Sequence, residues 1–139
     1  MITINLFKKL IFTSLFLLSL IIQGELITIL KNLLAYGKLS IFYFTGFLSL
    51  YPILIGIFLY LTIREMNFLK FNVRYDKKII ALLILLFYLT IVPLLYYTSI
   101  SKYLPFGLFL TQYYQITNLS GIIFGFLIFA LLTNSNKSK

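Results

Sequence analysis

The residues best suited to bind a proton or an ion lie in one short stretch, IIQGELITIL, where Glu25 follows Gln23 and Gly24. Glu25 is the only carboxylate inside an apolar run of this chain. An ionised group at membrane depth is costly, so it usually faces a bundle interior or a cavity. One reading is therefore a proton or cation site built from Glu25 and Gln23. The other is an interface carboxylate that packs locally or pairs with Lys31 or Lys38.

A second group of polar residues lies in the stretch TQYYQITNLS, residues 111–120. Gln115 and Asn118 are three residues apart, so on a helix they share nearly one face and are predicted to hydrogen bond to a neighbouring helix. Thr117, Gly121 and Gly125 follow one another at intervals of four residues and form a ridge of small residues. Such ridges let helix backbones approach closely in lipid. We expect this ridge to pack helices together, within one chain or between chains.

Residues for catalysis or metal binding are scarce. The chain has no cysteine and no histidine, which excludes disulfides, thiol redox chemistry and His/Cys zinc sites. Glu65 and Asp76 lie eleven residues apart in one polar segment, whereas acid–base catalysis usually needs two positioned groups with separated pKa values. No nucleophile elbow, phosphate-binding loop or dinucleotide fingerprint is present. We expect no catalytic residue, no cofactor and no metal site, and the chain is not predicted to be an enzyme.

The elements that hold these residues follow from the composition. Of 139 residues, 61% are hydrophobic and 11% are charged, against about half and about a quarter in ordinary soluble domains. A water-soluble fold of this size has too little interior for so many apolar side chains. Four apolar runs approach the ~20 residues that a helix needs to cross the hydrocarbon layer. The sequence predicts an all-α membrane protein, one integral membrane domain over residues 1–139, with spans of about 10–30, 39–63, 79–100 and 106–132.

Prolines interrupt two of these runs and precede a third. Pro52 and Pro93 lie inside the second and third spans, where each should bend its helix. Pro105 opens the fourth. A continuous helix from 105 to 132 would be about 42 Å long, which exceeds the ~30 Å hydrocarbon core. Either this helix tilts and protrudes, or a short interfacial segment before about Tyr114 leads into a span from about Gln115 to Leu132. We favour a protruding or broken start.

Loop charges predict the orientation. With four spans, both termini and the middle loop share one side of the membrane. That side holds nine of the twelve basic residues: Lys8, Lys9, Arg64, Lys70, Arg74, Lys77, Lys78, Lys137 and Lys139. The other side holds Lys31, Lys38 and Lys102. The positive-inside bias then predicts two antiparallel hairpins with cytoplasmic N and C termini, in a bacterial cytoplasmic membrane or an organelle inner membrane.

The middle loop, residues 64–78, is the sizeable polar connection of the chain. Its residues alternate between apolar and polar from 71 to 76, which favours a short extended segment or one that lies at the headgroups. Five basic residues there are candidates to contact anionic lipid, at ~1 kcal/mol each, or a cytoplasmic partner protein: Arg64, Lys70, Arg74, Lys77 and Lys78. The net charge of +9 does not indicate nucleic acid, because the basic residues fall between apolar runs and form no soluble basic face.

Two functional hypotheses remain. The first is a small non-catalytic membrane subunit of the scaffold, sensor, defence or immunity type, which assembles in the bilayer with itself or a partner and presents the basic loop. The second is a small proton- or cation-coupled transporter or channel that places Glu25, with Gln23, Gln115 and Asn118, around an oligomeric pathway. The architecture resembles that of small multidrug-resistance exporters, fluoride channels and membrane immunity proteins, but no motif matches any of them.

Overall fold

The computed structural model describes residues 2–66 and 76–135, and this part of the chain contains helices and turns but no strand. In chain order the elements are α1 (Ile2–Ala35), α2 (Ile41–Met66), α3 (Lys77–Tyr96), the 3₁₀ turn η1 (Ser99–Tyr103), α4 (Gly107–Gln112) and α5 (Tyr114–Ser135). The helices α1, α2, α3 and α5 are long and apolar enough to cross a membrane. The predicted all-helical fold, with four helices long and apolar enough to span a membrane, is confirmed for the described residues.

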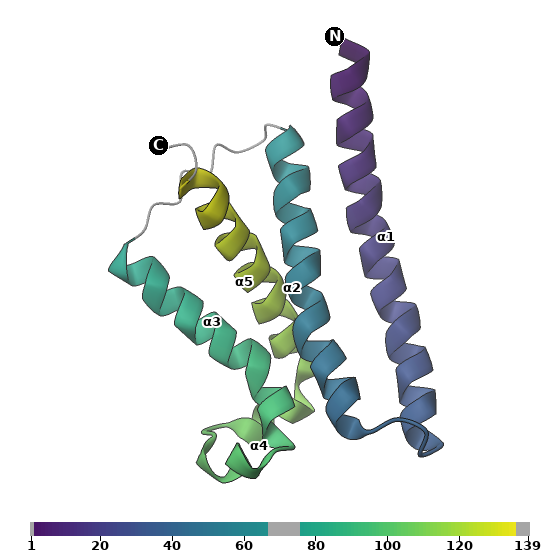
Figure 1. The fold of residues 1–139 in the computed structure, drawn as a ribbon, viewed down its shortest axis with the longest axis vertical. Coiled ribbons are helices and arrows are strands. Elements are labelled where there is room, and N and C mark those ends of the chain that lie inside the picture. The colour runs from purple at the N-terminus through teal and green to yellow at the C-terminus, as the bar shows by residue number, and fades with distance from the viewer. Residues whose placement is uncertain (1, 67–75, 136–139) are drawn as a thin grey trace.

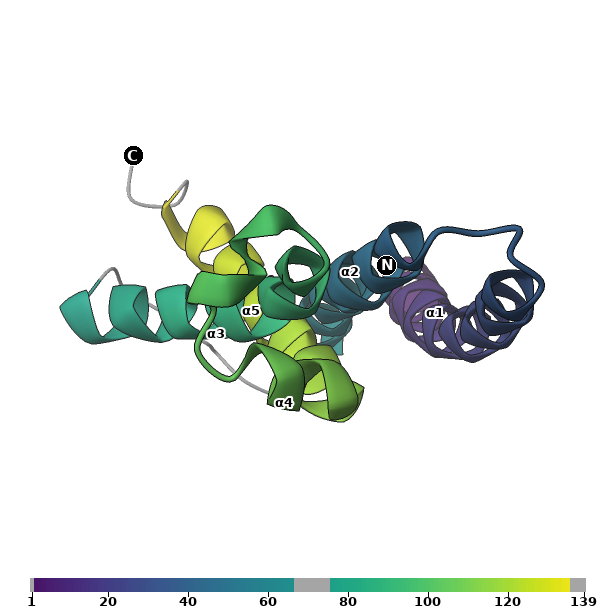
Figure 2. The same ribbon diagram turned by 90° about the horizontal axis from the view of Figure 1, so that it is seen from below.

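The four long helices stand in a row rather than in a square bundle (Figure 1, Figure 2). Helix α1 forms one edge of the row and α3 forms the other, with α2 and α5 between them. The most extensive packing joins α2 to α5, while α1 packs on α2 and α3 packs on α5. In Figure 1, α1 and α3 run downward and α2 and α5 run upward, so the two central helices run parallel.

The turn between α1 and α2 has a clear sequence basis. Gly37 adopts a positive φ of 68°, the left-handed conformation in which glycine commonly ends a helix. Its N–H donates to the Leu34 carbonyl (3.0 Å), and the Lys38 N–H donates to the Leu33 carbonyl (2.9 Å). Ser40 then caps the next helix, since its hydroxyl accepts from the Phe42 N–H (3.3 Å). These residues stop α1 and start α2 within five positions.

The fourth hydrophobic segment is broken, as the sequence favours. Phe106 precedes α4 with a positive φ of 58°, and Tyr113 leaves helical geometry before α5 begins at Tyr114. The crossing helix therefore starts about eight residues later than the predicted span of 106–132. Figure 1 shows α4 as a short helix beyond the end of the row, opposite the end where α1 begins and α5 finishes.

The outer spans also differ from their predicted bounds. Helix α3 ends at Tyr96 rather than near Ile100, because the Thr98 hydroxyl caps the 3₁₀ turn by accepting from the Ile100 N–H (3.4 Å). Helix α1 covers 34 residues, about 51 Å at 1.5 Å per residue, and so extends past the predicted span of 10–30 at both ends. The extra turns carry Lys8, Lys9 and Lys31.

Candidate functional site

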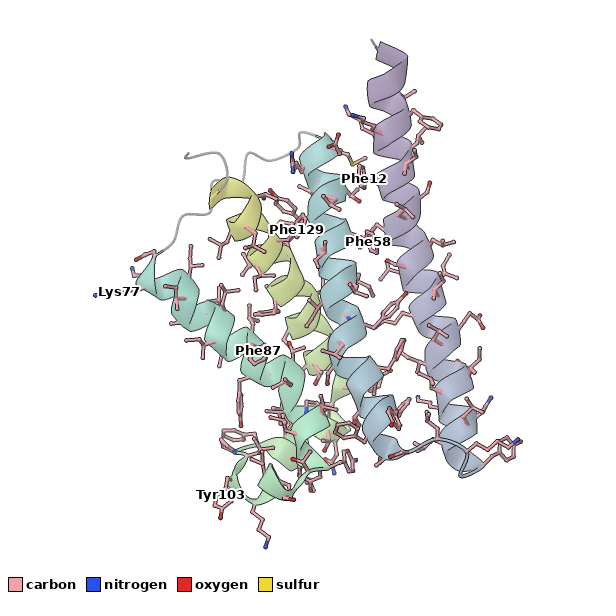
Figure 3. All side chains as sticks on the ribbon, viewed as in Figure 1. Phe12, Phe58, Lys77, Phe87, Tyr103 and Phe129 are labelled. Carbon is pink, nitrogen blue, oxygen red and sulfur yellow. The ribbon has the colours of Figure 1, made fainter. Side chains whose placement is uncertain are left out.

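The interior of the described part holds about as many buried polar as buried apolar side chains, unlike the core of a soluble protein. Among the described residues, buried polar side chains are Ser19, Gln23, Thr45, Ser49, Thr62, Thr90, Thr117 and Ser120. Large apolar side chains instead cover the outside of the row, most densely on α1 and α3, from which they project into the surroundings in Figure 3. Because lipid tails solvate apolar side chains but leave polar groups without partners, this arrangement suits a bilayer.

The ridge of small residues on α5 meets α2 of the same chain. A Cβ atom added to Gly121 would lie 2.8 Å from Pro52 Cβ, and one added to Gly125 would overlap the carbonyl oxygen of Ile53. From the other side, a Cβ on Gly56 would overlap the carbonyl oxygen of Ile122. The two backbones are therefore in direct contact along one face of each helix. The ridge is used within the chain, and its glycines are buried from any partner.

Only two of the polar residues of the other candidate site contact each other. Gln23 is buried and donates from Nε2 to Oδ1 of Asn118 (2.9 Å), which links α1 to α5. Glu25 and Gln115 are both exposed and make no hydrogen bond or ion pair within the described residues. Gln23 and Glu25 are two residues apart, so on a helix they point about 160° away from each other. The structure thus brings Gln23 to Asn118 and leaves Glu25 outside.

The outward face of α1 carries polar residues of its own. Exposed residues that share this face are Ser14, Gly24, Glu25, Thr28 and Asn32. A Cβ added to Gly24 would meet nothing within 4 Å, so packing inside the chain does not require a glycine there. Apolar residues lie on the same face among them, including Ile21, which is 65% exposed. The face lies opposite the one by which α1 contacts α2, and sequence reasoning singled out only Glu25 and Gly24 from it.

Two further polar contacts tie the inward face of α1 to α2. The Tyr51 hydroxyl donates to the Ser19 carbonyl (3.2 Å), and the Thr62 hydroxyl lies within bonding distance of the Phe12 carbonyl (3.0 Å). With Gln23, these contacts fall on one stripe of α1, at intervals of seven and four residues. Sequence reasoning missed this stripe because single Ser and Thr residues are common in membrane helices and signal no particular partner.

The basic residues lie at both ends of the row. Arg64, Lys77 and Lys78 are exposed where α2 ends and α3 begins, whereas Lys70 and Arg74 lie outside the described residues. At the opposite end, the Lys31 Nζ lies 5.8 Å from the centre of the Tyr114 ring, within the range of a cation–π contact. This contact joins the last turns of α1 to the first turn of α5.

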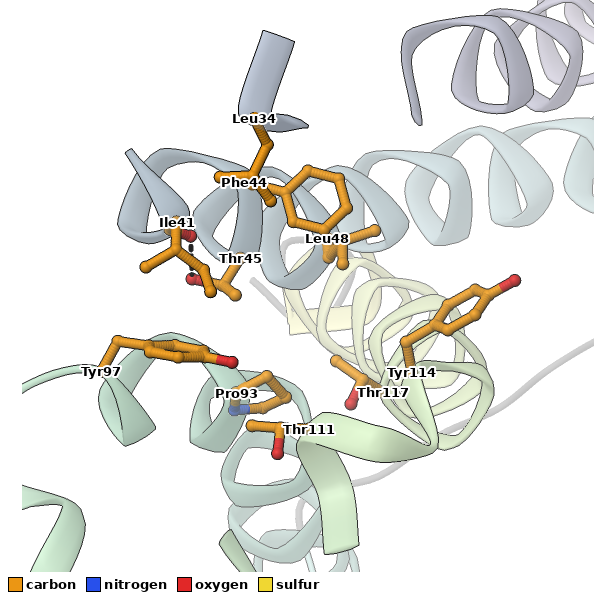
Figure 4. A pocket seen from close by; sticks show the side chains of 10 residues that line it. All are labelled: Leu34, Ile41, Phe44, Thr45, Leu48, Pro93, Tyr97, Thr111, Tyr114 and Thr117. Carbon is orange, nitrogen blue, oxygen red and sulfur yellow. Dashed lines mark hydrogen bonds between the residues drawn. The ribbon is translucent and has the colours of Figure 1, made fainter. Parts of the chain in front are cut away.

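A cavity of about 110 Å³ lies near that same end, where all the helices converge (Figure 4). Each α-helix contributes to its wall, with Leu34 from α1, Thr45 from α2, Pro93 from α3, Thr111 from α4 and Thr117 from α5, and Tyr97 lines it directly after α3. Of these residues the sequence singled out Thr117 and Pro93, but the first as part of the packing ridge and the second as a helix bend. The polar character of residues 111–120 was the available signal for the cavity.

These features, together with the four apolar helices, are compatible with a small multi-pass integral membrane protein. Comparison of the chain with protein-family models, with curated protein sequences and with solved structures finds no match.

Proposed function

We propose that this chain is a non-catalytic membrane subunit that assembles in the bilayer with itself or a partner through the outward face of α1. The proposed location is a bacterial cytoplasmic membrane or an organelle inner membrane. The basic segment around Arg64, Lys77 and Lys78 faces the cytoplasm in this proposal, where it attracts anionic lipid or a partner protein.

One observation carries the proposal: α1 exposes the Glu25 carboxylate, the Asn32 amide and Gly24 on a single face. Glu25 lies six residues before Lys31, about 9 Å deeper along the helix axis, where exposure of a carboxylate to lipid is costly. Gly24 weakens the helix by about 1 kcal/mol relative to alanine, and nothing inside the chain requires it. A helix from another subunit accounts for both features, because it covers the carboxylate and approaches the backbone at the glycine.

Cysteine cross-linking in membranes tests the proposal, because the chain has no natural cysteine. Thr28→Cys places one thiol at the centre of the outward face, and mild oxidation should give a disulfide-linked dimer if the partner is a second copy. Ser19→Cys on the buried face and Ala81→Cys on the exposed part of α3 are matched controls and should stay monomeric. For a different partner, a photoreactive cross-linker on Thr28→Cys should give an adduct of another mass. A monomer in both experiments contradicts the proposal.

The transporter or channel alternative depends on the same interface. Glu25 lines no path inside the described part of the chain, so a pathway that uses it has to form between subunits. Glu25→Gln separates the two functions. A plain subunit keeps its Thr28→Cys cross-link and has no ion flux to lose, whereas a transporter loses proton or cation flux into liposomes while the cross-link remains.

A further inference from the structure

The cavity at the convergence of the helices contains a hydroxyl group that the fold leaves without a partner. Thr117 is 0% exposed, and its Oγ1 has no hydrogen-bond partner. Its side chain extends from α5 toward Pro93 and Thr111 in the wall of the cavity (Figure 4). A buried hydroxyl without a partner costs about 1–3 kcal/mol, so each such group calls for an explanation.

Most other buried hydroxyls of this chain are satisfied by their own helix. Each lies within bonding distance of a carbonyl three or four residues earlier, as in Ser19, Thr45, Thr62, Thr90 and Ser120. Ser49 and Thr117 are the exceptions among the described residues. Only Thr117 of these two lines the cavity.

The break before α5 explains why Thr117 differs. Four residues earlier lies Tyr113, which has left helical geometry with φ −103° and ψ 64°. The Tyr113 carbonyl instead accepts from the N–H of Ile116 (3.0 Å). The carbonyl four residues before Thr117 is therefore turned away from its hydroxyl, and the hydroxyl has no partner among the described residues.

The chemistry of the wall defines the class of ligand. Thr45 and Thr111 each hydrogen bond with a carbonyl of their own helix and retain oxygen lone pairs that can accept. The other wall residues are apolar or aromatic, and none carries a formal charge. An ion would enter without a counter-charge, which is unfavourable in a buried site. A neutral molecule with one hydrogen-bonding oxygen and a short apolar body fits these walls.

The volume limits the size of that molecule. An engineered cavity of ~150 Å³ holds benzene, so about 110 Å³ accommodates roughly four or five non-hydrogen atoms. We propose that this cavity binds a compact, uncharged hydroxyl or carbonyl group, attached to a short apolar body, through the hydroxyl of Thr117. Such a group occurs in a free solute and in the glycerol-ester region of a bilayer lipid. This inference does not depend on assembly through α1.

Protection of a single thiol in the cavity wall tests the proposal. Thr111→Cys provides the thiol and keeps Thr117 intact, methyl methanethiosulfonate is the neutral labelling reagent, and 1-butanol is the probe ligand. In lipid-free detergent, 1-butanol should slow labelling in a saturable manner. Lys102→Cys, which lies outside the cavity wall, is the control and should not be protected.

Substitutions at position 117 then identify the hydroxyl as the binding group. Adding Thr117→Val to the reporter should raise the half-protecting concentration of 1-butanol about fivefold, the loss expected for one hydrogen bond. Thr117→Ala should do the same, and Thr117→Ser should restore protection. Absence of protection in the Thr117 background, or equal protection in all four backgrounds, overturns the proposal.

The same labelling experiment in phosphatidylcholine nanodiscs distinguishes a bilayer lipid from a free solute as the ligand. If lipid occupies the cavity, labelling of Thr111→Cys is already slow without 1-butanol, and Thr117→Val accelerates it. If a free solute is the ligand, labelling stays fast until 1-butanol is added. Labelling that is slow regardless of residue 117 contradicts both forms of the proposal.

Discussion

Helices α5 and α1 both pack against α2, but through contacts of opposite kinds. Between α2 and α5, glycines bring the backbones into contact, and rings close the far end, where Tyr60 lies 5.4 Å from Phe126 between ring centres. Helix α1 has no such glycine contact with α2, and its buried described residues are Ser19 and Gln23. Polar contacts therefore locate α1, while close packing locates α5.

The two kinds of contact leave α1 and α5 with different capacities to bind a further subunit. Lipid tails are as apolar as leucine, so in a bilayer only close packing and hydrogen bonds distinguish a helix neighbour from lipid. The α2–α5 pair has the closer packing and forms the fixed centre of the row. Helix α1 is held by a few hydrogen bonds at one face, and its opposite face remains available to another subunit.

The largest expected effect comes from blocking the α2–α5 contact. Gly125→Val places a side chain against the backbone of Ile53, which cannot move aside as a flexible side chain would. We expect a loss of about 3 kcal/mol or more in the free energy of unfolding, at the upper end for overpacking. Unfolding with sodium dodecyl sulfate, followed by circular dichroism, measures this change. Gly24→Val is the matched control and should leave the stability of the monomer nearly unchanged.

A smaller effect should follow from breaking the link between α1 and α5. Gln23→Leu, Asn118→Leu and the double variant form a cycle whose coupling energy reports the amide pair. We expect about 0.5–1.5 kcal/mol, the range for hydrogen bonds between membrane helices. A coupling energy of zero in the same detergent assay contradicts the assignment of this pair as the link.

Two tyrosines on α2 each place a hydroxyl against a neighbouring helix, one in each region. The Tyr60 hydroxyl contacts the Thr133 hydroxyl of α5 at 2.7 Å, while the Tyr51 hydroxyl donates to the Ser19 carbonyl of α1 at 3.2 Å. Replacement of either by phenylalanine should cost about 0.5–1 kcal/mol. Hydrogen exchange distinguishes them: Tyr51→Phe should speed exchange in α1 alone, and Tyr60→Phe in the last turns of α5. Equal effects on all helices count against the separation of the two regions.

The smallest effect is expected at Gln115. This side chain is exposed and has no partner in the described part of the chain, unlike Asn118 one turn later. Gln115→Leu should change the free energy of unfolding by no more than about 0.5 kcal/mol. A loss as large as that of Asn118→Leu places Gln115 in the same contact and revises the description of the α1–α5 link.

Hydropathy alone predicts much of the architecture. The four long helices and the broken start of the fourth follow from local patterns, namely long apolar runs and a polar stretch after Pro105. The small-residue ridge on α5 is also visible in the sequence. These features depend on a residue and its near neighbours, so a linear pattern is sufficient to find them.

Which side of each helix packs inward was decided only by the tertiary structure. Apolar residues are spread around α1, so no amphipathic pattern indicates which side packs inward. The sequence therefore grouped Gln23 with Glu25, whereas packing buried Gln23 against Asn118 and left Glu25 outside. The cavity beside Thr117 likewise arises where five helices meet, since a cavity is a property of their convergence and not of any one segment.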